Sequence, residues 1–402
     1  ATFADPDVGW LATLDSTDPR SPVFDVWRTT DGGRTWTKAV LPEGANRSDT
    51  MGAADFSVVG TGHVLLWIEG GMPNGWTSDL YESTDAGATW SGPRTSSPGV
   101  SGLATFADGT HGVVAGGASG HDLIRTSDGG TTWESVRYPL PAGATRKLTT
   151  FPTPARFWDA RHGAIAAIYS TPDLIPMLVI LTTADAGATW TVAATHVDQG
   201  RVAFLDAEDW VEVTGASVGL SADGGTTWST WAMPSLPGAI SDLSMPDVRN
   251  GWAVVRDFGC HSGCEVSLVA TTDGWHTAAA LTPGAPGARP LASGTPEPTA
   301  STQVGLDVSA LAFSDGRNGL AGGEAPTGGD SGANAAEGRI ERTSDGGRTW
   351  DVTSYSGSPV LALAAADGLA WAATGCLDAP ARRASSRART AAGPGRPPHG
   401  IS

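Results

Sequence analysis

The chain has 402 residues, of which 54 are Gly, 27 Pro and 16 Trp, and its 42 acidic and 25 basic side chains give a net charge of −17. This acidic balance argues against nucleic acid as a partner, because binding nucleic acid relies on clustered Lys and Arg. No apolar run reaches 18 residues, which excludes a membrane-spanning helix, and no stretch shows the 3.6-residue periodicity of an amphipathic helix.

Pairs of short apolar strands recur along the chain, joined by a polar turn that ends in Gly. They lie at residues 1–14, 103–117, 157–170, 240–255 and 311–323. A Gly after Asp, His or Asn suits a tight turn that needs a positive φ. His111 and His162 occupy the position before this Gly, so we expect structural roles for both.

An eight-residue phrase of the form S/T-x-D-x-G-x-T-W, here called the box, occurs seven times. Asp side chains bond to backbone N–H groups a few residues on, Gly supplies the left-handed conformation, and Thr with Trp resumes a strand. We therefore predict a self-bonded hairpin turn at each box, with the Trp ring packed between sheets and its N–H available to a loop carbonyl. The box aspartates are Asp31, Asp85, Asp128, Asp185, Asp223, Asp273 and Asp345.

The sixth box, around Asp273, lacks its second Gly and its Trp. Trp10 and Trp252 lie outside the boxes, in Gly-Trp strands, and we read them as packing residues because large aromatic side chains are usually buried. Successive box aspartates are separated by 38 residues (Asp185 to Asp223) to 72 residues (Asp273 to Asp345), so the repeat has loops of unequal length.

One strand enters each box and another leaves it, which gives about four antiparallel strands per repeat, the content of one propeller blade. We predict an all-β, seven-bladed propeller of four-stranded antiparallel blades, with eight blades as the alternative. Seven blades follow if the strand pair at residues 360–375 joins the blade begun by Ala1, since a ring is sealed when both chain ends share a sheet.

The predicted propeller domain covers residues 1–377. Two segments rich in Pro, Gly, Ala, Ser and Thr, at 284–302 and 324–338, are expected to be flexible insertions. Residues 378–402 are expected to form a disordered basic tail. Its composition matches nothing upstream, and a shifted reading frame could also have produced it.

The boxes resemble the Asp-box, or BNR, repeats of sialidases, sortilin-type receptors, some endoglucanases and photosystem II assembly-factor-like propellers. Gly-Trp-Ala-Val strands together with TTDGGRTW are most similar to the assembly-factor-like group. The resemblance covers roughly residues 1–375 and implies the fold, but no single activity, because these proteins include enzymes and non-enzymes. In the assembly-factor-like group arginines mark the contact surface, and this acidic chain shows no such cluster, so a photosystem role is not carried over.

Catalytic residues remain unassigned. Sialidase chemistry needs three arginines, a Tyr nucleophile with its Glu and an acid/base Asp, whereas this chain has four tyrosines and no Arg-Ile-Pro-like motif near its start. An endoglucanase needs two carboxylates across a groove. The loops offer acidic candidates for such a pair, namely Asp15, Asp18, Glu69, Asp173, Asp257 and Glu324. A sialidase-like or endoglucanase-like glycoside hydrolase is therefore the alternative function, and we expect neither cofactor nor metal.

Loops between the second and third strands of propeller blades converge on one face of the ring, where binding sites usually form. We predict a non-catalytic, monomeric propeller that binds a protein or carbohydrate partner through this face. The contact residues expected from these loops are Arg20, Glu69, Trp76, His121 and Arg256.

Cys260 and Cys264 flank His261, Ser262 and Gly263 in a predicted hairpin loop. Both a small loop disulfide and half of a metal site fit this spacing, but zinc needs two further ligands and Cys376 is a poor candidate. We expect the disulfide, which favours an extracytoplasmic or secreted protein. No signal peptide is visible, and the chain opens on Ala1 within a strand, as a mature or trimmed form would.

Overall fold

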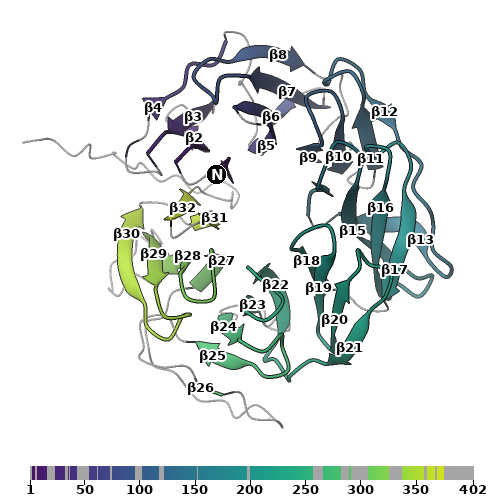
Figure 1. Ribbon diagram of the computed structural model, residues 1–402, viewed down its shortest axis with the longest axis vertical. Helices are drawn as coiled ribbons and strands as arrows, with labels where there is room; N and C mark the ends of the chain where they lie inside the picture. The colour runs from purple at the N-terminus through teal and green to yellow at the C-terminus, as the bar shows by residue number, and fades with distance from the viewer. Residues whose placement is uncertain are drawn as a thin grey trace, which may run out of the picture.

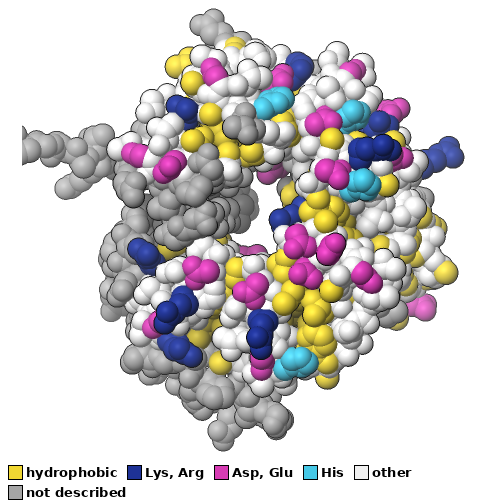
Figure 2. Space-filling model, viewed as in Figure 1, with side chains coloured by type: hydrophobic (Ala, Val, Ile, Leu, Met, Phe, Trp, Pro, Cys, Tyr) yellow, Lys and Arg dark blue, Asp and Glu magenta, His cyan; other side chains and the backbone are white. Residues whose placement is uncertain are grey.

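The computed structural model describes residues 2–4, 7–15, 23–31, 35, 37–42, 54–60, 62–72, 75–95, 102–116, 122–151, 153–196, 200–256, 266–281, 289–290, 307–325, 337–356, 360–366 and 369–374. Seven antiparallel sheets, here called blades 1 to 7, are arranged in a ring (Figure 1). The ring has an opening at its centre (Figure 2). The predicted seven-bladed propeller of four-stranded blades is confirmed.

Each blade runs outward from its first strand to its last, and consecutive strands of the chain are neighbours in the sheet. Blades 1 to 3 comprise β1 (Thr2–Phe3), β2 (Gly9–Asp15), β3 (Val23–Thr29) and β4 (Thr37–Lys38); β5 (Ala54–Gly60), β6 (His63–Met72), β7 (Gly75–Ser83) and β8 (Ser91–Thr95); and β9 (Gly102–Phe106), β10 (Gly112–Gly116), β11 (Asp122–Thr126) and β12 (Glu134–Ser135).

Blades 4 to 7 follow the same plan, except that blade 4 splits its innermost strand in two and blade 6 gains a short fifth strand. They comprise β13 (Thr145–Thr150), β14 (Arg156–Phe157), β15 (Gly163–Ser170), β16 (Pro176–Thr183) and β17 (Thr191–His196); β18 (Gly200–Phe204), β19 (Asp209–Thr214), β20 (Ser217–Ala222) and β21 (Ser229–Ala232); β22 (Ala239–Ser244), β23 (Gly251–Arg256), β24 (Val266–Thr271), β25 (Ala279–Leu281) and β26 (Arg289–Pro290); and β27 (Asp307–Phe313), β28 (Gly319–Ala325), β29 (Glu337–Thr343) and β30 (Asp351–Ser356).

A further strand pair lies between blade 7 and blade 1 (Figure 1). β31 (Val360–Ala366) and β32 (Leu369–Thr374) pair with each other as a separate two-stranded sheet. The prediction that this pair joins the blade begun by Ala1 is therefore wrong. In blade 1 the inner edge of β2 is already paired with β1, so the later strands stack beside the sheet and do not extend it.

Two other predicted boundaries need correction. The connection that carries Glu69 and Trp76, expected to be a loop between a second and a third strand, is mostly strand, because β6 and β7 stay paired as far as Met72 and Gly75. The 324–338 insertion is shorter than expected, since β28 and β29 are paired up to Ala325 and Glu337. The strand β26 lies within the expected 284–302 insertion. It pairs with the outer edge of β25, where blade 6 has no other strand. The expected tail at 378–402 lies outside the described residues.

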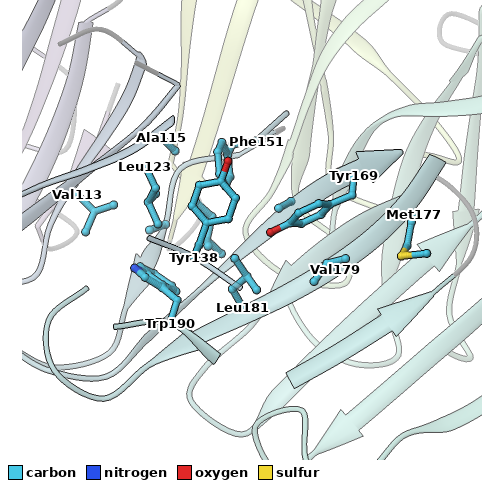
Figure 3. Packing of buried hydrophobic residues seen from close by; sticks show 13 residues of the cluster. Val113, Ala115, Leu123, Tyr138, Phe151, Tyr169, Met177, Val179, Leu181 and Trp190 are labelled. Carbon is cyan, nitrogen blue, oxygen red and sulfur yellow. The ribbon is translucent and has the colours of Figure 1, made fainter. Parts of the chain in front are cut away.

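The core lies between the blades. The second and third strands are buried on both faces, as β15 and β16 show, which explains why their sequences are continuously apolar. One interblade cluster joins blades 3 and 4, where Val113 and Leu123 meet Val179 and Leu181 (Figure 3). Trp190, the box Trp of blade 4, closes one end of this cluster and donates its indole N–H to the Gly187 carbonyl at 3.1 Å.

Candidate partner-binding surface

The boxes form the predicted turns, between the third and fourth strands of each blade. In all seven, the first Ser or Thr donates its hydroxyl to Oδ1 of the Asp at 2.8–2.9 Å. The Thr four residues after the Asp donates its N–H to the same oxygen at 2.8–2.9 Å. Its hydroxyl donates to Oδ2 at 2.6–2.7 Å. Each box carboxylate is thus committed to its own hairpin.

A second Asp turn joins the first and second strands; its polar residues and final Gly were predicted, but the Asp that anchors it was overlooked. Its Asp Oδ1 accepts the N–H groups two and three residues on at 2.7–2.8 Å. These aspartates are Asp108, Asp159, Asp206, Asp247 and Asp315. The available signal, an Asp three residues before the His or Asn that precedes Gly, is present for every one of these aspartates except Asp206, which is followed at those positions by Asp209 and Trp210.

The expected structural roles of His111 and His162 are confirmed. Nδ1 of His111 lies 2.9 Å from Oδ2 of Asp108, and Nδ1 of His162 lies 2.8 Å from Oδ2 of Asp159. In blade 3 the box is also bonded to this second turn, because the Gly129 N–H donates to the Thr110 carbonyl at 2.8 Å. Both turns therefore lie at one end of the blades, here called the box end.

The carboxylates of the box end are poor general acids. Hydrogen bonds from Thr89 and Thr132 lower the pKa of Asp85 and Asp128 to about 2, and bonds from His162 lower that of Asp159 to about 2. A general acid working near neutral pH needs a raised pKa. These aspartates therefore stay anionic and anchor their turns. Acidic side chains are distributed around the ring on the face shown in Figure 2.

The innermost strands are edge strands, each with a row of backbone N–H and C=O groups that no strand of its own blade pairs. Side chains satisfy several of them. Ser57 and Ser244 accept the N–H groups of Phe106 and Phe313, both at 3.1 Å. Asp242 Oδ2 accepts the Leu311 N–H at 3.1 Å. An Asp-x-Ser sequence at 55–57 and again at 242–244 is the signal that could have revealed this linkage.

Asp55 and Asp242 have raised pKa values. Burial raises the pKa of Asp55 to about 6, partly offset by a hydrogen bond from the backbone of Ala104. Burial likewise raises the pKa of Asp242, opposed by hydrogen bonds from Leu311 and Leu243. Because both carboxyl groups bind the backbone of the next blade, they link blades together.

Arginines make further interblade bonds. Arg156 of blade 4 donates to the Phe204 carbonyl and, at 3.0 Å, to the Leu205 carbonyl of blade 5. Arg256 was a predicted partner contact, but its guanidinium donates to the Val308 carbonyl of blade 7 at 2.8 Å. This bond gives Arg256 a structural role in the ring, alongside any contact it makes with a partner.

The structure gives less information about the other predicted contact residues. Glu69 lies in β6 and Trp76 in β7, at the far end of that hairpin from the box. Arg20 and His121 lie outside the described residues, as do Cys260 and Cys264 of the expected disulfide. Their roles remain predictions.

An exposed apolar patch lies at the end of blade 4 opposite the box, here called the loop end. We define the patch as Leu140, Leu174 and Ile175, whose exposed fractions are 46%, 65% and 48%. They are three of the six large apolar residues exposed in the described chain. Contiguous exposed apolar surface marks interaction sites, whereas single exposed apolar residues do not.

Two segments build the patch. Leu140 lies in the connection from β12 to β13, while Leu174 and Ile175 lie in the turn from β15 to β16. The Tyr169 hydroxyl donates to the Pro139 carbonyl at 2.8 Å, and Thr145 pairs with Ser170. These bonds hold the two segments against each other.

Leu174 adopts an unusual backbone conformation, with φ at +63°. This left-handed region costs a residue with a Cβ about 1–2 kcal/mol and usually holds Gly or Asn. Thr171 fixes the turn, because its carbonyl accepts the Leu174 N–H at 2.9 Å and its hydroxyl accepts the Ile175 N–H at 3.1 Å. The turn thus holds a large apolar side chain in solvent at a conformational cost.

Buried aromatic rings of blade 4 pack close to the two segments that carry the patch. Tyr138 and Tyr169 pack edge to face, with ring centroids 6.2 Å apart, and Tyr138 packs against Phe151 in the same way at 5.7 Å. Figure 3 shows these rings together, with Met177 at the opposite end of the cluster from Trp190. Leu140 follows Tyr138 by two residues, so this part of the patch is joined by a short stretch of chain to the buried cluster.

Among the described residues, no three His, Cys, Asp or Glu side chains come together in a way that could hold a metal ion. That part of the chain also contains no helix long and apolar enough to cross a membrane.

No protein-family model and no curated protein matches the chain. Similar solved structures include YCF48 bound to a D1 peptide, at 15% identity over 80% of this chain and 93% of that one, with a TM-score of 0.41. A putative 6-phosphogluconolactonase from Bacteroides uniformis is 12% identical over 87% and 96%, with a TM-score of 0.44. A Hadza microbial sialidase is 18% identical over 66% of each chain, with a TM-score of 0.32. With all three scores below 0.5, the architecture rests on the strand pairing of this chain.

Proposed function

We propose that the chain is a non-catalytic binding propeller that takes up a protein partner at the loop end of blade 4. The observation that carries the proposal is Leu174, an exposed apolar side chain held in a left-handed turn next to exposed Ile175, at the same end of the blade as exposed Leu140. Strained residues persist where a function requires them. A partner that covers the patch would gain burial energy that offsets the cost of exposing it.

The chemistry of the patch favours protein over carbohydrate. Its three side chains are aliphatic, and the neighbouring Pro139, Pro141 and Pro172 add further apolar surface. Aliphatic side chains of a partner polypeptide can pack on such a surface by dispersion. Carbohydrate sites instead combine an apolar platform, usually aromatic, with several converging polar groups.

We further propose that the partner is extracytoplasmic and that the propeller acts as a monomer. The extracytoplasmic setting is supported by the expected Cys260–Cys264 disulfide. Arg20 and His121 fall in the sequence between second and third strands, Glu69 and Trp76 lie near the β6–β7 turn, and the turn that carries Leu174 also joins a second strand to a third. We expect these residues to extend the contact surface around the ring.

A selection experiment tests the proposal. A random peptide library displayed on phage is selected on the folded protein, and the dissociation constants of synthetic copies of the enriched peptides are measured. We expect enriched peptides to carry aliphatic residues and to bind the double variant Leu174→Asp/Ile175→Asp at least about tenfold more weakly, as loss of an interface hot spot would cause.

Val192→Asp is the matched control, because Val192 is also exposed (39%) on blade 4 but lies on β17, away from the patch. Its affinity for the peptides should equal that of the unmodified protein. Peptides that bind all three proteins equally would refute the patch as the site. Binding of a glycan array that is lost in the double variant would show that the partner is carbohydrate.

A further inference from the structure

Two interfaces between adjacent blades, here called seams, are built from the same Asp-x-Ser sequence but differ in their hydrogen bonds. In the seam between blades 6 and 7, both carboxylate oxygens of Asp242 have donors. The Leu243 N–H donates to Oδ1 at 3.0 Å, and the Leu311 N–H of blade 7 donates to Oδ2 at 3.1 Å. Arg201 adds a positive charge near the same carboxyl group. Three groups therefore stabilise the charged form of Asp242 against the cost of burial.

Asp55 has fewer partners in the seam between blades 2 and 3. Its carboxyl group accepts a hydrogen bond from the Ala104 backbone, but within the described chain its Oδ2 is buried and has no hydrogen-bond partner. A weaker favourable influence on the charged form comes from the positive amino end of the chain. Because a buried carboxylate oxygen without a donor is costly, the charged form of Asp55 is poorly stabilised in this seam.

The strands packed against Asp55 do not supply a counter-charge. Across the seam, β9 has the sequence GLATF, which contains no titratable side chain. In the same blade Asp55 pairs with Trp67 of β6, and the titratable residues on that face of β6 are His63 and Glu69. His63 lies four residues from Trp67, about 13 Å along the strand, and is paired with Glu82 at 2.8 Å. Glu69 is itself acidic, so neither residue offsets a negative charge on Asp55.

The backbone amides of β9 report directly on this seam. The Ala104 N–H bonds to the Asp55 carboxyl group, and the Phe106 N–H donates to Ser57 Oγ at 3.1 Å. Ala104 and Phe106 also belong to the buried cluster that contains Trp67. An opening that lets water reach Asp55 therefore breaks both backbone hydrogen bonds, and it does so without requiring the other seams to open.

We propose that Asp55 makes the seam between blades 2 and 3 a pH-sensitive contact of the ring, which stays closed while the carboxyl group is protonated and opens more readily once it is ionised. Water that enters the open seam solvates the charge, so ionisation favours the open form. The pKa of Asp55 is raised from 3.8 to about 6 in the closed seam. The stabilisation by the protonated group is thus complete below about pH 4 and is lost as the pH rises to about 6.

This device goes beyond the proposed binding function and is independent of it. Asp55 lies in the seam between blades 2 and 3, whereas the apolar patch lies on blade 4. Either proposal can fail while the other stands.

Hydrogen exchange of single backbone amides, measured by NMR on the full chain between pH 4 and 7.5, tests the proposal. Protection is the measured rate relative to that of an unstructured peptide at the same pH. We expect protection of the Ala104 and Phe106 amides to fall at least about tenfold as the pH rises, and up to about 100-fold for a pKa raised from 3.8 to about 6. The Leu311 and Phe313 amides of the seam between blades 6 and 7 are the matched reference and should lose less protection.

Two variants separate the charge from the hydrogen bonds. Asp55→Asn keeps an acceptor for the Ala104 N–H but cannot ionise. We expect protection of Ala104 and Phe106 to become independent of pH in this variant, while the seam between blades 6 and 7 behaves as in the unmodified protein. Ser57→Ala removes the acceptor of the Phe106 N–H and leaves the charge in place. It should lower the protection of Phe106 at every pH and keep the pH dependence.

Several outcomes would overturn the proposal. Protection of Ala104 that falls with pH in Asp55→Asn as in the unmodified protein would mean that another group controls the seam. Loss of the pH dependence at both seams in Asp55→Asn would mean that Asp55 acts on unfolding of the whole chain. If this variant does not fold, the unmodified protein decides: an equal fall at both seams, or no fall at Ala104 and Phe106, contradicts a pH-sensitive seam.

Discussion

Burial of the Asp55 carboxyl group makes its charged form unfavourable in the folded chain. Its pKa is about 6 in the folded chain, against 3.8 for the unperturbed group, so between these values the folded chain binds more protons than the unfolded one. Stability therefore falls as the pH rises from about 4 to about 6, by as much as ~3 kcal/mol for a shift of this size.

The variant Asp55→Asn removes this titration. The amide oxygen can still accept the Ala104 N–H, and no charge is buried. We expect the free energy of unfolding in urea to increase by about 1–3 kcal/mol at pH 7.5 and to change little at pH 4. The control, Asp173→Asn in an exposed loop, should change neither value. An equal effect of Asp55→Asn at both pH values would contradict this account of Asp55.

Leu174 allows function to be separated from stability. Gly adopts a φ of +63° without strain, so Leu174→Gly should stabilise the turn by about 0.5–1 kcal/mol, measured by urea unfolding. The same change removes the exposed apolar side chain, so binding of the selected peptides should weaken at least about tenfold. A variant that loses stability, or that binds as well as the unmodified protein, would show that Leu174 is not retained for a partner.

At the scale of the element, the sixth box carries its Trp at a different position from the other boxes. The Gly position holds Trp275, whose N–H donates to Thr271 Oγ1 at 2.8 Å, as the Gly N–H does in other boxes. Trp275 has a φ of +68° and is fully buried among Val211, Val213 and Val255. The indole that is missing from the eighth position is thus supplied from the fifth, and Ala278 closes the turn.

Restoring the usual Gly should therefore destabilise the protein. Trp275→Gly relieves about 1 kcal/mol of backbone strain but removes a buried indole, which costs about 3–5 kcal/mol. We expect a net loss of about 2–4 kcal/mol in urea unfolding. The matched control is Ala86→Gly in the second box, where φ is +59° and little apolar volume is lost, so stability should stay equal or rise. A stabilised Trp275→Gly variant would contradict this role of Trp275.

The sequence predicted the hairpins well because the box is self-contained: Asp, Gly and Thr within eight residues satisfy one another. The Asp that anchors the second turn was readable in the same way but was overlooked. The loop end was less predictable. A Leu with positive φ, such as Leu174, has no sequence signature, because Gly or Asn is the residue that such a conformation usually selects. The strand extension to Met72 was also hidden, since Gly70, Gly71 and Pro73 suggest a loop.

At the scale of the whole molecule, the two ends of the ring have different chemistry. The box end is built from anionic turns with lowered pKa values, and the loop end carries the apolar patch. Asp85, Asp128 and Asp159 contribute stability above their unfolded pKa of 3.8, and this stability is lost as the pH falls toward about 2. Asp55 has the opposite trend between about pH 6 and 4.

Together these groups predict a stability maximum near pH 4 to 5 and acid unfolding between about pH 4 and 2. Thermal unfolding followed by circular dichroism across pH 2 to 8 checks this expectation. A midpoint temperature that falls steadily from pH 6 to pH 4 would contradict the assigned charges.

The central claim is that partners bind at the loop end of blade 4, while the carboxylates and histidines of the box end serve the fold. Positions 174 and 162 lie at opposite ends of β15, about 25 Å apart for a strand of this length. A photo-crosslinking phenylalanine analogue is placed at either position, and each variant is irradiated with a selected peptide. We predict a crosslink from position 174 and none from position 162. A crosslink from position 162 with none from position 174 would contradict the account.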